Sequence, residues 1–358
     1  MQTALTQVVL FCRAGFEREC AGEMQELAAN QGVYGYPQFE PASGYVLFIC
    51  TEPGGAYKLI HSLPWQQPVF TRQWAACLPT LGAVPKQDRV GWLVQAMADF
   101  PQGGEVWVEA PDSEQGGQLQ TLCRKLTPPL ASALRKAGKL SEKRNLKQPR
   151  LYVAWLTEQQ VVVGLAKPAN AAPWPQGIMR LKFPAGAPSR STLKLDEAWR
   201  FFLSAEEQQS WLQPGMTAVD LGAAPGGWTW QLAHQHFRVT AVDNGPMDEA
   251  LMESGLVKHR QEDGFTYVPE RPVDWMVCDI ADKPSRSIDL MARWFEQGWC
   301  RFSVFNLKLP MQKRLAAYQQ CREVFESRMQ AAGLQVEMRW RQLYHDREEI
   351  TAFVRLLD

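Results

Sequence analysis

Three charged residues fall at the ends of apolar stretches that are expected to form β-strands. Asp279 closes VDWMVCD, Lys308 closes FSVFNLK and Glu349 opens EITAFV. A fourth, Lys194, lies in the first turn of a predicted helix that ends near Leu203. Amines and carboxylates that converge on one site can move protons, because a neighbouring cation lowers the pKa of an amine while carboxylates orient it. The alternatives are structural salt bridges at strand ends and, for the lysine in the helix, a solvated surface charge.

The stretch TAVDLGAAPGGWTWQL, from Thr217 to Leu232, reads as a buried strand, a turn of small residues and a helix. Glycines in the turn let the backbone approach a ligand closely, because no Cβ intervenes. The string GAAPGG lacks the spacing of a dinucleotide site and the Gly-Lys-Ser/Thr of a P-loop. Pro225 also removes a donor that a phosphate would need. The turn therefore favours an uncharged or zwitterionic ligand, with an ordinary glycine-rich turn as the alternative.

The segment VDLGAAPGGW resembles motif I of the Rossmann-like methyltransferases that use S-adenosylmethionine, and specifically of the RNA ribose 2′-O-methyltransferases. The order Lys194, Asp279, Lys308, Glu349 matches the Lys-Asp-Lys-Glu tetrad of that family. The resemblance implies that Lys308 is the general base for the 2′-hydroxyl and that Asp279 orients it near the methyl group. Lys194 and Glu349 are then supports. Glu349 is aligned rather than Glu348 because the family's glutamate directly precedes an apolar strand.

The same resemblance implies S-adenosyl-L-methionine as the cofactor, and no metal is expected. Asp243 ends the strand VTAVD, where a carboxylate can accept ribose hydroxyls. Asp263 would lie at the adenine edge, although Asp-Gly is also a frequent turn signal. Asp220, inside the first strand, either orients the glycine turn or touches the ligand. The implied cofactor-binding residues are Ser191, Gly222, Ala224, Pro225, Gly226, Gly227, Asp243, Asp263 and Asp279.

Strands at Rossmann-like spacing surround these residues: 217–221, 239–243, 257–260, 273–278 and 302–308. Helices near 228–236, 288–297 and 314–329 alternate with them, which predicts a mostly parallel sheet with its ligand at the carboxyl ends of the strands. Two last strands follow without an intervening helix and are expected to pair antiparallel at the sheet edge. Ser191 or Thr192 is expected to cap the helix that carries Lys194.

The first half of the chain has the pattern of a smaller α+β region. Strand, helix, strand, strand within about fifty residues suggests half of a ferredoxin-like fold. Further strands and helices follow, including two helices separated by Pro128 and Pro129 and a hairpin ending near Lys167. This arrangement resembles a THUMP RNA-binding domain. The predicted domains are 1–55 (ferredoxin-like), 56–167 (THUMP-like), 168–188 (a proline-rich linker) and 189–358 (Rossmann-like methyltransferase).

Basic residues concentrate between Thr121 and Arg150, a stretch that contains nine basic residues and only one acidic residue, Glu142. A basic surface would hold an RNA backbone through charge, with little sequence information, although a charge run is usually a solvated face. The residues proposed to bind RNA are Arg124, Lys125, Arg135, Lys136, Lys139, Lys143, Arg144 and Lys147.

Composition sets broader limits. Lys+Arg and Asp+Glu both number 38 in 358 residues, so the net charge of the whole chain says nothing about a polyanionic partner. Eight cysteines without a C-x-x-C pair suggest neither disulfides nor zinc. No signal peptide or membrane-spanning run is recognised, so a cytoplasmic protein is expected. The whole chain resembles the bacterial enzymes that methylate the ribose of a cytidine in 23S ribosomal RNA, which implies that RNA as partner. No membrane is expected, no protein partner is evident from the sequence, and the oligomeric state is left open.

Other activities remain as alternatives. Base N-methyltransferases carry an Asn/Asp-Pro-Pro-aromatic turn where this chain has DIAD (279–282). Cytosine C5 methylation needs a cysteine nucleophile, and Cys278 reads better as a small core residue. An N2-guanine RNA methyltransferase is the main alternative, because THUMP domains often accompany such enzymes. A catalytically idle RNA-binding protein and, less favoured, a nicotinamide-dependent oxidoreductase complete the set.

Overall fold

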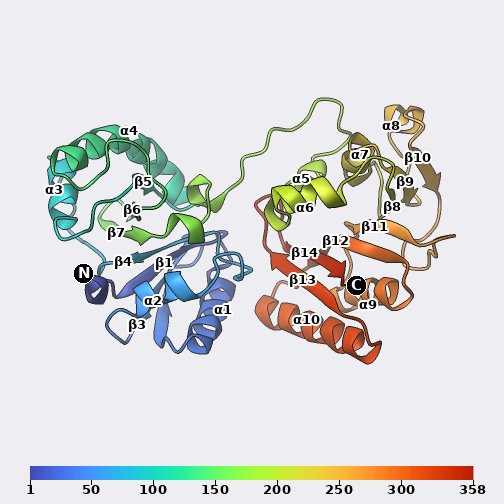
Figure 1. Cartoon of the computed structure of the whole chain (residues 1–358), viewed down its shortest axis with the longest axis horizontal. Helices are drawn as coiled ribbons and strands as arrows, with labels where there is room; N and C mark the ends of the chain where they lie inside the picture. Colours follow the sequence, from blue (N-terminus) through green and yellow to red (C-terminus); the bar gives the residue numbers. More distant parts are fainter. Residues whose placement is uncertain (358) are drawn as a thin grey trace. The chain divides into compact units, whose positions relative to one another are not determined.

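The computed structural model describes residues 1–357, and the chain divides into two compact units, Met1–Met179 and Arg180–Asp358. Each unit is built around its own seven-stranded sheet (Figure 1).

The first unit contains strands and helices in the order β1 (Gln7–Phe11), α1 (Glu17–Asn30), β2 (Gly35–Gln38), β3 (Tyr45–Cys50), α2 (Gly55–Ser62), β4 (Gln73–Cys77), α3 (Arg89–Ala96), β5 (Glu105–Glu109), α4 (Glu114–Lys136), β6 (Arg150–Thr157) and β7 (Gln160–Ala166). Short 3₁₀ turns occur at Gln2–Ala4, Pro168–Asn170 and Pro175–Gly177. The strand order across its sheet is β2-β3-β1-β4-β7-β6-β5.

The first six main elements follow the βαββαβ order of a ferredoxin-like fold. β1 pairs antiparallel with both β3 and β4, so α2 and β4 complete the pattern that β1 to β3 begin. The sheet then continues without a break, because β4 pairs with β7 through Ala76 and Cys77. Part of the predicted linker packs in this unit: the side chain of Gln73 donates to the carbonyl of Ala172, and that of Gln176 to the carbonyl of Ala110. The domain limits predicted from the sequence stay a prediction.

The prediction of two helices around Pro128 and Pro129 was wrong, because α4 runs through both prolines. A proline cannot donate to the carbonyl four residues earlier, which leaves the carbonyls of Arg124 and Lys125 without those bonds. These residues and the prolines are all exposed, so water can hydrate the freed carbonyls. The expected hairpin is present as β6 and β7, paired antiparallel.

The second unit contains α5 (Thr192–Phe202), α6 (Ala205–Trp211), β8 (Thr217–Leu221), α7 (Gly227–His234), β9 (Arg238–Val242), α8 (Glu249–Glu253), β10 (Val257–Arg260), β11 (Val273–Cys278), α9 (Pro284–Glu296), β12 (Cys300–Lys308), α10 (Arg314–Ala331), β13 (Val336–Arg341) and β14 (Glu349–Leu356). The strand order is β10-β9-β8-β11-β12-β14-β13.

Strands β8 to β12 are mutually parallel, and β14 lies antiparallel to both β12 and β13. The predicted edge pair of antiparallel strands is therefore confirmed. The strand order reverses between β8 and β11, because β9 and β10 extend the sheet on one side and β12 on the other. Ligands of open parallel sheets bind at such a switch point, outside the carboxyl ends of the strands.

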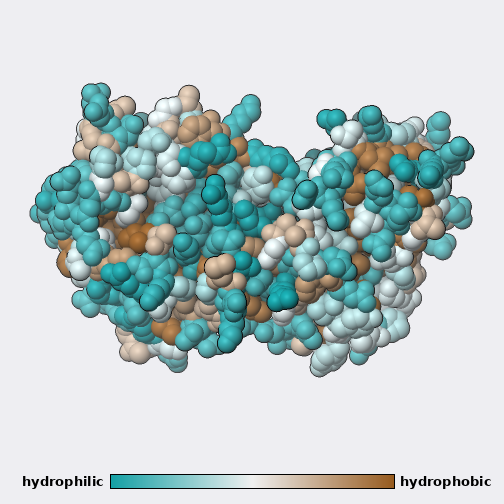
Figure 2. Space-filling model, turned by 180° about the vertical axis from the view of Figure 1, so that it is seen from behind, coloured by the Kyte–Doolittle hydropathy of each residue, from teal (hydrophilic) through white to brown (hydrophobic). Residues whose placement is uncertain are grey.

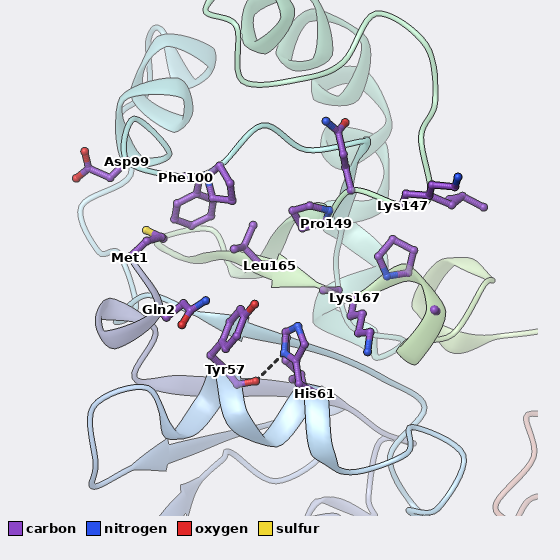
Figure 3. A pocket seen from close by; sticks show the side chains of 17 residues that line it. Met1, Gln2, Tyr57, His61, Asp99, Phe100, Lys147, Pro149, Leu165 and Lys167 are labelled. Atoms are coloured by element: carbon purple, nitrogen blue, oxygen red, sulfur yellow. Dashed lines mark hydrogen bonds between the residues drawn. The ribbon is translucent and has the colours of Figure 1, made fainter.

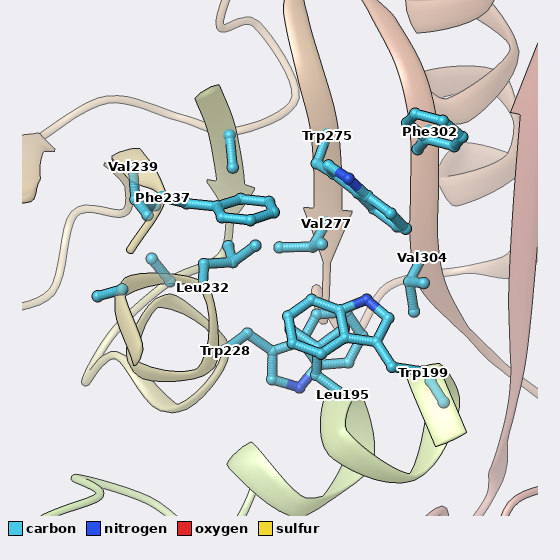
Figure 4. Packing of buried hydrophobic residues seen from close by; sticks show 14 of the residues in the cluster. Leu195, Trp199, Trp228, Leu232, Phe237, Val239, Trp275, Val277, Phe302 and Val304 are labelled. Atoms are coloured by element: carbon cyan, nitrogen blue, oxygen red, sulfur yellow. The ribbon is translucent and has the colours of Figure 1, made fainter. Parts of the chain in front are cut away.

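A cluster of large aromatic side chains holds α5 and α7 on this sheet (Figure 4). Trp275 of β11 is fully buried, stacks on Phe302 at 4.9 Å and meets Trp199 of α5 edge-on at 6.2 Å. Trp228, at the start of α7, is 2% exposed in the same cluster. Each such ring buries a large apolar area, so the helix starts that flank the switch point are fixed by packing.

The face of the molecule in Figure 2 carries mainly hydrophilic and intermediate residues, with separate hydrophobic patches. Among the described residues, no helix is both long enough and apolar enough to cross a bilayer.

Candidate active site

The glycine turn links β8 to α7 at the switch point. Gly222 (φ 78°) and Gly226 (φ 119°) adopt left-handed conformations that favour glycine. A Cβ on Gly222 would lie 2.6 Å from the Ile280 side chain, and one on Gly227 would lie 2.1 Å from the Oγ of Ser191. The Ala224–Pro225 peptide bond is cis. The turn thus has only small side chains besides proline, and its three glycines have no room for a Cβ.

Asp243 follows β9 and lies against this turn. Its Oδ2 accepts a hydrogen bond from the backbone N–H of Ala224 at 3.0 Å, and its Oδ1 accepts one from Gly245 at 2.7 Å. A carboxylate offers about four lone-pair sites, so both oxygens of this half-buried group retain capacity for a further donor. The carboxylate beside exposed backbone fits a ligand that carries hydroxyls next to a compact zwitterionic group.

Ser191 and Asp263 lie at two edges of the same region. Ser191 is the N-cap residue of α5, but its side chain does not cap the helix. The capping prediction was therefore wrong, because Ser191 has a helical backbone (φ −60°, ψ −22°) instead of the extended one that side-chain capping needs. Its Oγ faces Ser189 at 3.0 Å. Asp263 is exposed after β10, and its Oδ1 accepts from the N–H of Phe265 at 2.9 Å in a local turn.

Asp220 lies in the interior of β8 and connects that strand to α7. Its Oδ2 accepts the hydroxyl hydrogen of Thr229 at 2.6 Å, and the residue is 1% exposed. Burial raises the pKa of Asp220 to about 7, against the lowering effect of the Thr229 hydrogen bond. Of its two possible roles, the contact with Thr229 supports the orienting one.

Three members of the proposed tetrad meet at the carboxyl edge of the sheet. The Nζ of Lys194 lies 3.0 Å from Oδ1 of Asp279 and 3.2 Å from Oε2 of Glu349. Their side chains are between 15% and 19% exposed, so the cluster is largely shielded from water. Glu348 instead pairs with Arg314 at 2.8 Å on the surface.

Lys308 is the last residue of β12 and lies opposite Glu349 in the register of β12 and β14. Its side chain is exposed, and it makes no hydrogen bond or ion pair with any of residues 1–357. The two lysines therefore differ: the amine of Lys194 is held by two carboxylates, and that of Lys308 is open to an incoming substrate.

The pKa of Lys194 differs from the sequence-based expectation, in which a neighbouring lysine lowers it. Burial alone would lower the pKa of Lys194, but the carboxylates of Asp279 and Glu349 raise it above its usual value. Burial raises the pKa of Asp279, and Lys194 and Asn306 oppose that effect. Lys194 is therefore a permanent cation near neutral pH.

A polar chain behind Asp279 was missed by the sequence analysis. The amide of Asn306 in β12 donates to Oδ1 of Asp279 at 2.7 Å, and the hydroxyl of Thr351 in β14 donates to Oδ1 of Asn306 at 2.8 Å. Asp346, fully buried, lies 2.9 Å from the same hydroxyl, and burial raises its pKa well above its usual value. A protonated Asp346 can donate to Thr351, which directs the single hydroxyl hydrogen toward Asn306.

Cys278, next to Asp279, is buried at the end of β11. Burial raises the pKa of its thiol to about 12. A neutral, buried thiol is a poor nucleophile, and this finding disfavours the alternative of cytosine C5 methylation. No group of three or more His, Cys, Asp or Glu side chains suited to a metal ion occurs within residues 1–357.

The predicted RNA-binding residues belong to the first unit and differ in their availability. Arg144 pairs with Glu105 at 2.8 Å, and half-buried Lys139 donates to the carbonyl of Phe100 at 2.9 Å. Arg150, part of the same basic run, is buried in an ion pair with Glu105. The remaining candidates are exposed on α4 or in the following loop: Arg124, Lys125, Arg135, Lys136, Lys143 and Lys147.

Comparison with known families divides the chain into three matched segments. Residues 5–75 match the RlmM ferredoxin-like domain, residues 88–167 match the N-terminal region of ribosomal RNA large subunit methyltransferase M, and residues 187–315 match the FtsJ-like methyltransferases. The predicted α/β class, with an N-terminal α+β region and a C-terminal Rossmann-like methyltransferase domain, is confirmed. So is the prediction of S-adenosylmethionine as cofactor. The likeness of the second module to THUMP stays a prediction.

The chain is also similar over nearly its full length to two curated proteins called ribosomal RNA large subunit methyltransferase M. The one from Azotobacter vinelandii is 48% identical over 347 residues, which cover 97% of each chain. The one from Pseudomonas putida (strain GB-1) is 47% identical over 354 residues, which cover 99% of each chain.

Proposed function

We propose, since this chain belongs to the ribosomal RNA large subunit methyltransferase M family, that it methylates the ribose 2′-hydroxyl of a cytidine in 23S ribosomal RNA. The methyl donor is S-adenosylmethionine, which supplies an electrophilic methyl group carried on a sulfonium. The observation that carries the proposal is the different environment of the two lysines at the carboxyl edge of the sheet.

The residues around the glycine turn fit this cofactor. We assign its amino acid portion to the bare backbone from Ala224 to Gly227 and its ribose hydroxyls to the carboxylate of Asp243. Ser191 and Asp263, at the two edges of this region, are assigned to the remaining contacts. The turn GAAPGG lacks the spacing of a dinucleotide site, and Pro225 removes one backbone donor that a pyrophosphate could use, which argues against a nicotinamide cofactor.

Lys308 is assigned as the general base. A 2′-hydroxyl is a poor nucleophile until its proton is removed in a fixed orientation. Lys194 is a poor base, because Asp279 and Glu349 hold its proton. The amine of Lys308 has no competing partner among the described residues and stands at the same edge of the sheet.

The other tetrad members then have positioning roles. The Lys194 ammonium fixes the carboxylates of Asp279 and Glu349 in one cluster. We assign Asp279, further held by Asn306, to orient the reacting amine beside the methyl group, as in the tetrad that the sequence resembles; Asp279 and Lys308, both within the described residues, make no ion pair in this structure. Glu349 stands directly across the β12–β14 ladder from Lys308.

Substitutions at residue 308 test whether Lys308 acts by accepting a proton or only by carrying a positive charge. Lys308→Arg keeps the charge, but a guanidinium stays protonated at any ordinary pH. We expect Lys308→Arg and Lys308→Ala to lose methyl transfer by at least about 100-fold, in the range for removal of a general base. Both variants should bind S-adenosylmethionine as the wild type does, measured by calorimetry.

The matched control is Lys313→Ala, which removes an exposed lysine from the loop after β12. It should transfer methyl groups normally. Normal transfer by Lys308→Ala would show that another group removes the proton. Alkaline hydrolysis of the product tests the site of methylation, since a 2′-O-methyl group blocks cleavage of the adjacent phosphodiester. Cleavage at the modified nucleotide would support the N2-guanine alternative.

A further inference from the structure

The first unit contains a pocket of about 930 Å³ between its ferredoxin-like half and its second half (Figure 3). Tyr57 and His61 of α2 form one wall, and Phe100 and Leu165 lie across from them. The volume is near the upper end of the range for pockets that enclose small ligands. Nothing in the methyl transfer chemistry uses this pocket, because every tetrad and cofactor residue belongs to the second unit.

An aromatic stack forms part of the lining. The rings of Tyr57 and His61 lie 4.0 Å apart at 29°, and the Nδ1–H of His61 donates to the carbonyl of Tyr57 at 2.8 Å. The carbonyl can only accept, so Nε2 of the neutral ring is left as an acceptor. The stack therefore offers a fixed planar surface with a polar edge, which is what a nucleobase needs from a protein.

The charge around the pocket is asymmetric. Lys147 and Lys167 are exposed on one side, and Asp99 lies on the opposite side (Figure 3). Lys139, whose amine donates to the carbonyl of Phe100, adds a third cation next to the lining. Two exposed amines beside an apolar, aromatic floor complement the phosphates of a nucleotide whose base is unstacked.

We propose that this pocket binds an unpaired nucleotide of the RNA substrate, at a site separate from the methylated residue. The base extends the Tyr57–His61 stack, and its flanking phosphates contact Lys147 and Lys167. The inference rests on the proposed function for the identity of the ligand as RNA. It assigns to the first unit a contact with single-stranded RNA that a uniformly basic surface would not provide.

The test uses the full-length protein and fluorescein-labelled hexamers of adenylate and cytidylate, with a blunt-ended RNA duplex, which has no unpaired nucleotide, as comparison. Tyr57→Ala should weaken binding of the hexamers by about 10-fold or more, the scale of base–aromatic stacking. Tyr57→Phe, which keeps the ring, should bind as the wild type does. Tyr34→Ala removes an exposed tyrosine outside the pocket and is the matched control.

The lysines give a second readout that does not depend on the aromatic wall. Lys147→Ala and Lys167→Ala should each reduce the slope of log affinity against log salt by about 0.7, the value for one phosphate contact on a single strand. Lys86→Ala, an exposed lysine outside the lining, should leave the slope unchanged. Both lysines are exposed, so their loss should not impair folding.

Photocrosslinking gives the position directly: a hexamer of 5-iodouridine should label Tyr57 or His61, as identified by mass spectrometry. Wild-type hexamer affinity in Tyr57→Ala, unchanged salt slopes in both lysine variants, or a crosslink confined to residues outside the pocket would overturn the proposal. These outcomes are independent of the catalytic assignment, because normal methyl transfer by Lys308→Ala would refute that assignment and leave hexamer binding intact.

Discussion

At the scale of single residues, neighbouring groups of the same type have different properties because their surroundings differ. Lys194 and Lys308 are both lysines at the carboxyl edge of one sheet, yet only Lys194 lies between two carboxylates. Asp220 lies within β8 and Asp243 directly follows β9, the neighbouring parallel strand. Asp220 is buried against Thr229, whereas Asp243 accepts hydrogen bonds from backbone N–H groups of Ala224 and Gly245. The sequence alone does not distinguish the two lysines or the two aspartates, because their different contacts appear only in the folded structure.

Asp220 leads to a prediction about pH and stability. Its pKa is about 7 in the folded protein and about 3.9 in an unfolded chain. Between those values the folded state binds a proton that the unfolded state has lost, so stability falls as pH rises toward 7 and then levels off. Asp220→Asn removes this titration.

We therefore expect the stability of Asp220→Asn relative to the wild type to improve by roughly 2–3 kcal/mol between pH 5 and pH 8, the linkage value for about two pH units. Urea unfolding at the two pH values measures it. Asp274→Asn, a carboxylate that accepts from Thr217 at the start of the same strand, is the comparison. A relative stability that does not change with pH would mean that Asp220 is ionised in the folded protein.

At the scale of elements, the pairing of β14 with β12 assembles the site. Because β14 runs antiparallel, its first residue, Glu349, reaches the edge at which β12 ends with Lys308. The same register brings Thr351 beside Asn306, so the polar chain to Asp279 crosses three strands. The ladder therefore sets the positions of Lys308 and Glu349 relative to each other.

Asn306→Ala should test that chain. Loss of the amide frees Oδ1 of Asp279 from one of its two donors, and a misplacement on the order of 1 Å can cost about 100-fold in rate. We expect kcat to fall by roughly 10- to 100-fold and cofactor affinity to change little, measured by steady-state kinetics and calorimetry. Ser303→Ala, buried in the same strand, is the control. A wild-type kcat in Asn306→Ala would leave Asp279 oriented by Lys194 alone.

Most elements of the second unit were predictable from local pattern. Strands 217–221 and 273–278 were expected with the bounds they have, since buried parallel strands are apolar runs between turn signals. Strand 257–260 also has its expected bounds, although its sequence, VKHR, is mostly polar. The short helices α6 and α8 were missed, although Ser204 and Glu207 form a capping box at the start of α6. Asn306 and Thr351 could not be found in this way, because their partners depend on a strand register that no local pattern specifies.

At the scale of the whole molecule, the chain is divided into two units by a short segment. Lys182 and Phe183 are exposed just after the division at Met179. Exposed connectors are preferred sites of proteolysis, because a protease must fit the chain into an extended form. Limited trypsin digestion should therefore cut first near Lys182 and give two resistant fragments of nearly equal length.

The cut protein should still bind S-adenosylmethionine, since the residues assigned to it all follow the cut. Methylation of ribosomal RNA should fall by an order of magnitude or more when RNA affinity no longer benefits from linkage of the two units. The double variant Arg180→Gln/Lys182→Gln is the matched control that should resist cleavage there, because trypsin also cuts after arginine and Arg180 is exposed in the same connector. First cuts within α4 or the loop after it would instead mean that the first unit opens more readily than the connector.

The continuous sheet of the first unit depends on one position that has no room for a side chain. Gly164 of β7 lies opposite Cys77 of β4, and a Cβ there would come within 2.2 Å of the carbonyl oxygen of Ala76. Alanine at this position would push β7 away from β4, where the two halves of the sheet are joined, while the core of each half would stay packed. A relative with a bulkier residue at this position would therefore have to join its two halves through a different pairing of strands.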